Sequence, residues 1–172
     1  MRALVYTVLV IELLFAFFYG RYIRVKEAKV KKLNNDFREY YEVVSRWIIL
    51  KNSGRKPEEY FRFHGIKRIA IYGAGPLGEM LYQELFGGEI QILYVVDQTR
   101  KEFENVKGAK VIHPSLIPNQ ETPDAIVITP MVFKTAILDV LCNLNLPNSV
   151  SFLMLDEIVN FFMSHEVQNE II

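Results

Sequence analysis

One stretch of the chain limits its fold more than any other. Within residues 67–97, a short β-branched run is followed by a glycine-rich turn, a helical pattern and a second apolar run. The two runs are Lys67–Tyr72 (KRIAIY) and Ile90–Val96 (IQILYVV), and the second is closed by Asp97. Between them, residues 73–78 have the spacing G-x-G-x-x-G. This glycine pattern is informative only between a strand and a helix, and here both are predicted.

The three glycines of this turn each meet a physical need of a diphosphate site. Gly73 allows a tight turn, Gly75 lets backbone N–H groups approach a diphosphate, and Gly78 lets the helix lie close to the strand. The first turn of the helix supplies N–H donors without helical partners and a partial positive charge. The candidate ligand-binding residues of the turn are Gly73, Ala74, Gly75, Pro76, Leu77 and Gly78.

An acidic residue follows at the position where such sites bind ribose. Asp97 lies nineteen residues after Gly78, at the predicted end of the second strand. A carboxylate there accepts hydrogen bonds from both ribose hydroxyls and disfavours a 2′-phosphate, so we expect an NAD-like ligand rather than an NADP-like one. Two alternatives stay open: the glycine turn can serve packing alone and bind nothing, and Asp97 can be a residue that merely ends a strand.

Three further runs have the length and composition of strands. They are Ala109–His113 (AKVIH), Asp124–Thr129 (DAIVIT) and Ser151–Leu155 (SFLML). Strands that alternate with helices predict an α/β fold with a parallel sheet and right-handed crossovers. We expect a Rossmann-like sheet of about five strands in the order 3-2-1-4-5, with the ligand outside the carboxyl ends of the strands. Thr129 then borders the cleft beside the glycine turn and is a further candidate binding residue.

The chain begins with a strongly apolar segment, Ala3–Tyr19, whose only charge is Glu12. Its seventeen residues reach the lower limit for a helix that crosses the bilayer core. Six basic residues follow between Arg21 and Lys32, and the positive-inside rule puts this side in the cytoplasm. We expect residues 1–23 to form a transmembrane or hydrophobic anchor helix in the cell membrane, with the Rossmann-like domain on the cytoplasmic side. The alternative, which Glu12 favours, is a helix buried against a partner or the domain.

An amphipathic helix is predicted next, within residues 24–54. Apolar residues recur there at spacings of three and four, as in an a/d seam, at Val30, Leu33, Phe37, Tyr40, Val44 and Trp47. This 30–47 helix can join a second copy of the chain or a partner protein, or it can pack on its own domain. Tyr41, Val43 and Ile48 widen the stripe and favour the last alternative. Residues 55–160 then form the nucleotide-binding domain, and residues 161–172 form a C-terminal tail.

Composition and missing motifs exclude several kinds of chemistry. Twenty Lys and Arg balance twenty Asp and Glu, so we expect no nucleic-acid partner. The single Cys142 allows no internal disulfide and is expected in the core, and no spacing of His, Cys and acids predicts a metal site. No P-loop follows the glycines, and the only Tyr-x-x-x-Lys pair, Tyr22 to Lys26, precedes the domain. We therefore assign no catalytic residue, and binding is favoured over turnover.

The stretch from Trp47 to Asp156 resembles the Rossmann-like domains of bacterial surface-polysaccharide biosynthesis proteins. The resemblance rests on the sequences GIKRIAIYGAGPLGEMLYQEL, YVVD, AKVIHPSLIP and PDAIVIT, and it covers about two thirds of the chain. Similar domains precede nucleotide-sugar dehydratases and epimerases of capsule synthesis, and sugar acetyltransferases. The resemblance implies a nucleotide-sugar as the alternative to NAD, with Gly73, Gly75, Gly78 and Asp97 at the matching positions. The sequence ends where the catalytic half of those enzymes would begin.

Together these features predict a membrane-tethered module that binds a dinucleotide or nucleotide-sugar and is accessory to surface-polysaccharide biosynthesis. Two other functions stay open. One is a scaffold or interaction module whose Rossmann-like domain binds no ligand. The other is an NAD-responsive regulatory domain of a transporter or channel. Against the second, Ala109–Leu116 lacks the Gly-Asp-Ala sequence that such domains carry after their third strand.

Overall fold

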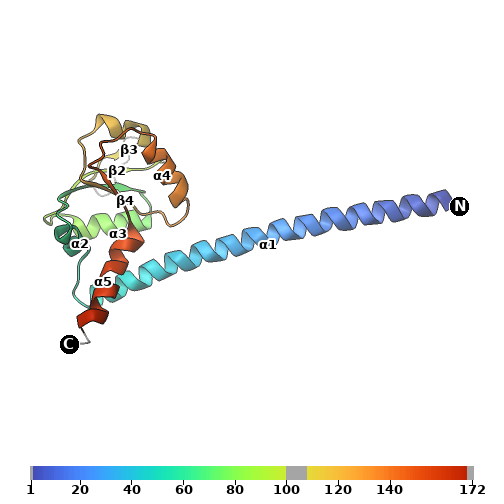
Figure 1. Ribbon diagram of the computed structural model, residues 1–172, viewed down its shortest axis with the longest axis horizontal. Helices are drawn as coiled ribbons and strands as arrows, with labels where there is room; N and C mark the ends of the chain where they lie inside the picture. The colour runs from blue at the N-terminus through green and yellow to red at the C-terminus, as the bar shows by residue number, and fades with distance from the viewer. Residues whose placement is uncertain (1, 100–107, 170–172) are drawn as a thin grey trace. The chain divides into compact units, whose positions relative to one another are not determined.

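The computed structural model describes residues 2–99 and 108–169, with the side chains of residues 12, 14–99 and 108–162. The chain divides into two compact units, Met1–Tyr41 and Glu42–Ile172. The first unit is helical in its described part. The second unit holds the sheet, the helices around it and both apolar clusters described below (Figure 1).

The second unit is built on a five-stranded parallel sheet in the order β3-β2-β1-β4-β5. The strands are β1 (Arg68–Tyr72), β2 (Gln91–Val96), β3 (Val111–Ile112), β4 (Ala125–Ile128) and β5 (Ser151–Met154). The predicted α/β class and strand order are thus confirmed. β3 is shorter than predicted because only Val111 and Ile112 pair with β2, at the edge of the sheet.

Helices cover both faces of the sheet, which explains the continuous apolar runs of its strands. Ile69 and Ile71 of β1 face a cluster formed with α2 (Pro57–Phe63), α3 (Pro76–Leu85) and α5 (Leu155–Asn169). Ala70 and Tyr72 alternate with them and face the other cluster. That cluster includes residues of α4 (Lys134–Cys142) and of the 3-10 helix η1 (Pro114–Asn119). Figure 1 shows α4 on one side of the sheet and α3 with α5 on the other.

The first helix, α1, runs without interruption from Arg2 to Asn52. The sequence predicts two elements here, an anchor helix and a separate amphipathic helix, whereas the structure has a single helix. Hydropathy changes near residue 20, but the backbone continues because the segment has no proline, and a single glycine costs a helix only about 1 kcal/mol. The helix ends before Gly54, whose φ of +76° suits a C-terminal cap.

The apolar stripe of α1 has two different environments. Val43, Trp47 and Leu50 are buried in the core of the second unit, so the prediction that this helix packs on its own domain is confirmed for its last turns. Leu33 and Phe37 belong to the first unit and are exposed by 67% and 71%. The prediction that the stripe joins a second copy or a partner protein stays a prediction.

Among the helices formed by the described residues, none is long and apolar enough to cross a membrane. The side chains of residues 3–11 and 13, which make up much of the predicted anchor, lie outside the described residues. The anchor stays a prediction from the sequence.

The C-terminal part of the chain differs from the predicted tail. α5 begins at Leu155 and continues to Asn169, beyond the predicted start of the tail at residue 161. Its residues Leu155, Ile158, Val159 and Phe162 recur at helical spacing and are buried against the sheet. Cys142 was expected in the core but is exposed, because it lies at the end of α4 and Leu141 fills the buried position beside it.

Candidate nucleotide-binding site

The strand register brings three predicted site residues to one edge of the sheet. Tyr72 of β1 pairs with Val96 of β2 and with Ile128 of β4. The next residue of each strand is Gly73, Asp97 or Thr129, so these three lie side by side at the carboxyl ends of the strands. Ligands of open parallel sheets bind outside this edge.

Gly73 makes the turn out of β1 and cannot be replaced without strain. Its φ is +108°, and a Cβ atom there would lie 2.6 Å from Thr129 Oγ1 and 2.8 Å from Pro130 Cδ. Its N–H donates to the carbonyl of Val96 at 2.7 Å, which ties the turn to β2. Both the backbone angle and the lack of space require glycine.

Gly78 is the last glycine of the turn and lies in the first turn of α3, close to the backbone of Gly73. A Cβ atom at Gly78 would lie 1.9 Å from the carbonyl oxygen of Gly73. No backbone atom can give way by that amount, so only glycine allows α3 to lie this close to the turn. Ala74 and Leu77, two further predicted site residues, are buried beside it.

Gly75 differs from the other two glycines because none of the described residues requires it. Among residues 2–99 and 108–169, no atom would lie within 4 Å of a Cβ atom there, and its φ of −82° is open to all residues. Gly75 is the N-cap of α3 and, like Pro76 after it, is exposed. The space beyond this helix end is open, and it faces the first N–H groups of α3, which have no acceptor within the helix.

Asp97 has a second role that the sequence did not reveal. Its Oδ2 accepts a hydrogen bond from Ala74 N–H at 2.8 Å, and its Oδ1 accepts from the N–H and the hydroxyl of Thr99 at 2.8 Å and 2.7 Å. The carboxylate therefore fastens the glycine turn to the loop after β2.

Thr129 supports the turn from below. Its side chain is 2% exposed, and its Oγ1 lies 3.0 Å from the carbonyl oxygen of Tyr72 and 3.3 Å from that of Gly73. A hydroxyl has one hydrogen to donate, which is shared between these two oxygens. The structure thus places Thr129 as a residue that positions the glycine turn, beneath it and away from solvent.

A cleft of about 390 Å³ opens beside the turn, between the loop after β2 and the start of α4. One wall is polar and consists of Asp97, Gln98 and Thr99. The other wall is mostly apolar and includes Val132, Phe133, Ala136 and Val140. None of these four residues is among the site residues predicted from the sequence. Volumes of about 300–1,000 Å³ are typical of small-ligand sites.

Tyr72 also lines this cleft, and its hydroxyl oxygen is buried. Burial raises the pKa of Tyr72, and the nearby Asp97 carboxylate raises it further. The phenol therefore keeps its proton at neutral pH. A protonated phenol cannot act as a base.

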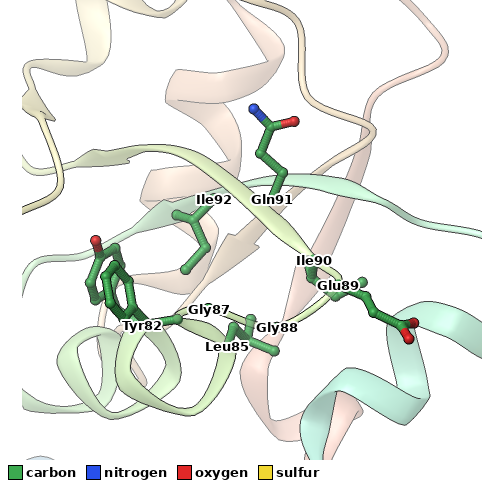
Figure 2. Close-up of a pocket in the computed structure, with 9 residues that line it drawn as sticks. Tyr82, Leu85, Gly87, Gly88, Glu89, Ile90, Gln91 and Ile92 are labelled. Carbon is green, nitrogen blue, oxygen red and sulfur yellow. The ribbon is translucent and has the colours of Figure 1, made fainter.

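A second pocket, of about 300 Å³, lies at the opposite edge of the sheet, between the end of α3 and the start of β2. Figure 2 shows Tyr82 and Leu85 on one side of it, with the carboxylate of Glu89 pointing away from Tyr82. Glu89 is paired with Arg62 of α2 at 3.3 Å. This pocket lies at the amino end of β2, so it is not at the edge where a nucleotide binds.

Comparison with protein families identifies the region that contains this site. The family model described as "C2185-like, N-terminal" matches residues 65–150, which is 86 of 172 residues. The chain belongs to the C2185-like N-terminal family. The match spans β1 to β4 and α4, and so includes the whole glycine turn, Asp97 and both walls of the cleft.

Two solved structures are similar to this C2185-like N-terminal domain. UDP-D-quinovosamine 4-dehydrogenase from Vibrio fischeri is 25% identical with a TM-score of 0.40, and the alignment covers 55% of this chain and 84% of that one. RSP in complex with β-NAD⁺ and operator DNA is 14% identical with a TM-score of 0.41, covering 61% of this chain and 58% of that one. At these TM-scores neither similarity carries an argument about ligands. No curated protein matches the chain by sequence.

Two expectations about partners and metals rest on the sequence alone. The expectation of no nucleic-acid partner depends on the balance of charge alone. The comparisons do not support it. Among the described residues, no group of three His, Cys, Asp or Glu side chains could hold a metal ion.

Proposed function

We propose that the domain binds the diphosphate of a dinucleotide or nucleotide-sugar at the glycine turn. One observation carries the proposal. Gly73 and Gly78 are fixed by their surroundings, whereas a Cβ atom at Gly75 would touch none of the residues that the structure describes. A glycine that the protein's own packing does not require, at the N-terminus of a helix, fits a backbone that a phosphate approaches closely.

The remaining parts of the site suit the rest of such a ligand. Asp97 lies beside the turn, and a carboxylate at this position is the group that binds ribose hydroxyls in such sites. The cleft next to it has one polar and one apolar wall, which fits a ligand that combines a sugar with a flat ring. We assign no residue of the site to proton transfer, so the proposed function is ligand binding and not catalysis.

The test is calorimetric titration of the full chain with NADH, NADPH and UDP-glucose, together with the Gly75→Val variant. We expect wild type to bind at least one of them. Gly75→Val should abolish that binding, because two methyl groups would fill the space of the diphosphate, and should lower the melting temperature only by the small cost of a poorer N-cap. Gly78→Val is the matched control for packing and should lower the melting temperature. Absence of binding by wild type at about millimolar ligand, or full binding by Gly75→Val, would refute the proposal.

A ligand-free scaffold is the second candidate. The bonds from Asp97 to Ala74 and from Thr129 to the carbonyls of Tyr72 and Gly73 favour it, because they hold the turn in shape without a ligand. The titration above separates the two candidates.

We further propose that the chain is attached to the cell membrane through residues 3–19, with the domain in the cytoplasm, and serves surface-polysaccharide biosynthesis. The support comes from the sequence: an apolar segment, the basic residues after it, and the resemblance described above. The test of the biosynthetic role is deletion of the gene, with loss or shortening of surface polysaccharide as the expected result. An unchanged polysaccharide would refute this role and leave the binding proposal intact.

A further inference from the structure

Phe133 has a backbone conformation that is unusual for its residue type. It is the N-cap of α4, with φ of 70° and ψ of 18°, in the left-handed region. The other described non-glycine residue with positive φ is Asn145, and asparagine tolerates this region. For a bulky residue such as phenylalanine the conformation is strained, and strain of this kind clusters at binding sites.

Neither helix capping nor burial in the core requires a phenylalanine at this position. N-caps favour small polar residues whose side chains accept a hydrogen bond from the helix, and Phe133 makes no such bond. The side chain is also 69% exposed, so burial in the core does not account for it. Glycine or asparagine would adopt the same backbone with less strain.

The ring lies where the proposed ligand would extend from the glycine turn. Phe133 is part of the apolar wall of the cleft, with Val132, Ala136 and Val140. Asp97 and Thr99 form the polar wall across from it. A ligand with a flat ring and vicinal hydroxyls would bury the ring on one wall while its hydroxyls reach the carboxylate on the other.

We propose that Phe133 is the stacking platform for the heteroaromatic ring of the nucleotide, and that its strained backbone holds the ring at the wall of the cleft. This inference rests on the proposed function and adds the residue that selects for a nucleobase-like ring. Stacking of a base on an aromatic side chain contributes a large part of binding in other nucleotide sites. The platform requires an aromatic side chain but no particular polar group.

The test compares Phe133→Asn and Phe133→Tyr with wild type in calorimetric titrations of the full chain with NADH. Asparagine suits the left-handed backbone, so Phe133→Asn should melt no lower than wild type and still bind NADH about tenfold more weakly. Phe133→Tyr keeps the ring and should bind within about twofold of wild type. Phe86→Asn is the matched control, because Phe86 is also 69% exposed but lies beside the pocket at the opposite edge of the sheet. It should not change the affinity.

The outcomes separate the failure of this inference from the failure of the proposed function. Wild-type affinity in Phe133→Asn, combined with loss of binding in Gly75→Val, would overturn the platform and leave the diphosphate site intact. Equal weakening by Phe86→Asn would also overturn it, since the effect would not be specific to the cleft. If wild type binds none of NADH, NADPH and UDP-glucose, both proposals fail.

Discussion

At the scale of single residues, the glycine turn is held by contacts between segments that lie far apart in the chain. The carboxylate of Asp97 reaches back 23 residues to the N–H of Ala74, and the hydroxyl of Thr129 reaches back to Tyr72 and Gly73. These contacts come from three strands that end at the same edge. The shape of the turn therefore depends on the sheet as well as on its own glycines.

The Asp97→Asn variant should lower both stability and affinity. An amide has one oxygen acceptor and one N–H donor group, so its nitrogen must face the N–H of either Ala74 or Thr99. We expect a loss of about 1–3 kcal/mol in the free energy of unfolding. The discrimination between NADH and NADPH should also narrow. Urea denaturation and titration measure the two effects.

The control is Thr99→Val, which removes one of the bonds to Asp97 Oδ1 and leaves the bond to Ala74 in place. Its loss of stability should be smaller than that of Asp97→Asn. An Asp97→Asn protein as stable as wild type would show that the carboxylate does not hold the turn.

At the scale of elements, the amino ends of β1 and β4 are joined by one carboxylate. Asp124 Oδ2 accepts from the N–H groups of Lys67 and Arg68 at 3.0 Å and 2.9 Å, and Oδ1 accepts from the Arg68 guanidinium at 3.0 Å. Burial alone would raise the pKa of Asp124, but these hydrogen bonds and the Arg68 charge together lower it below the ordinary 3.8.

A lowered pKa in the folded state makes this joint dependent on pH in a definite direction. The stabilising contribution is complete above the ordinary value of 3.8 and is lost as the pH falls through the lowered pKa. Asp124→Asn should therefore cost about 1 kcal/mol at neutral pH, a modest value because the side chain is partly exposed. The difference from wild type should shrink below about pH 4.

Urea denaturation of both proteins at several pH values between about 7 and 3 measures this difference. Asp139→Asn, an exposed carboxylate on α4, is the control and should show little difference at any pH. A difference between wild type and Asp124→Asn that stays constant down to about pH 3 would contradict the prediction.

The end of α1 is part of the core, and this predicts where the domain can be cut. Trp47 is 1% exposed and Leu50 is 2% exposed, both in the cluster beneath the sheet. Trp47→Ala should lower the free energy of unfolding by about 3–5 kcal/mol, the usual range for a large aromatic residue in a core.

A chain that begins at residue 55, and so lacks the end of α1, should aggregate or melt far lower than one that begins at residue 42. Equal melting temperatures for the two truncated chains would refute this.

Several elements could be predicted from the sequence because their signals are local. The strands are short β-branched runs, and the glycine spacing with Asp97 identifies the turn and the sheet order that accompanies it. The continuity of α1 has no such local signal, because a change from apolar to basic residues alters solvation without altering backbone preference. The internal bonds of Asp97 and the φ of Phe133 depend on tertiary packing, so no local pattern of residues indicates them.

At the scale of the whole molecule, the prediction concerns topology in the cell. The apolar segment Ala3–Tyr19 and the basic residues from Arg21 to Lys32 predict an integral membrane protein with its domain in the cytoplasm. Carbonate extraction should leave the full chain in the membrane fraction, and protease added to intact spheroplasts should not cleave the domain. A chain that begins at residue 42 serves as the control and should be released. Release of the full chain, or cleavage of its domain from outside, would refute the anchor.

The burial of Trp47 also provides an optical signal. It is the only tryptophan in the chain, and its indole lies in an apolar environment at the point where α1 enters the core. Excitation selective for tryptophan therefore reports on a single known site. Its emission should lie at short wavelength in the native protein and shift to the red when water reaches the indole. Detachment of the end of α1 from the sheet can thus be followed in real time, without any label, in the same sample that is titrated with ligand.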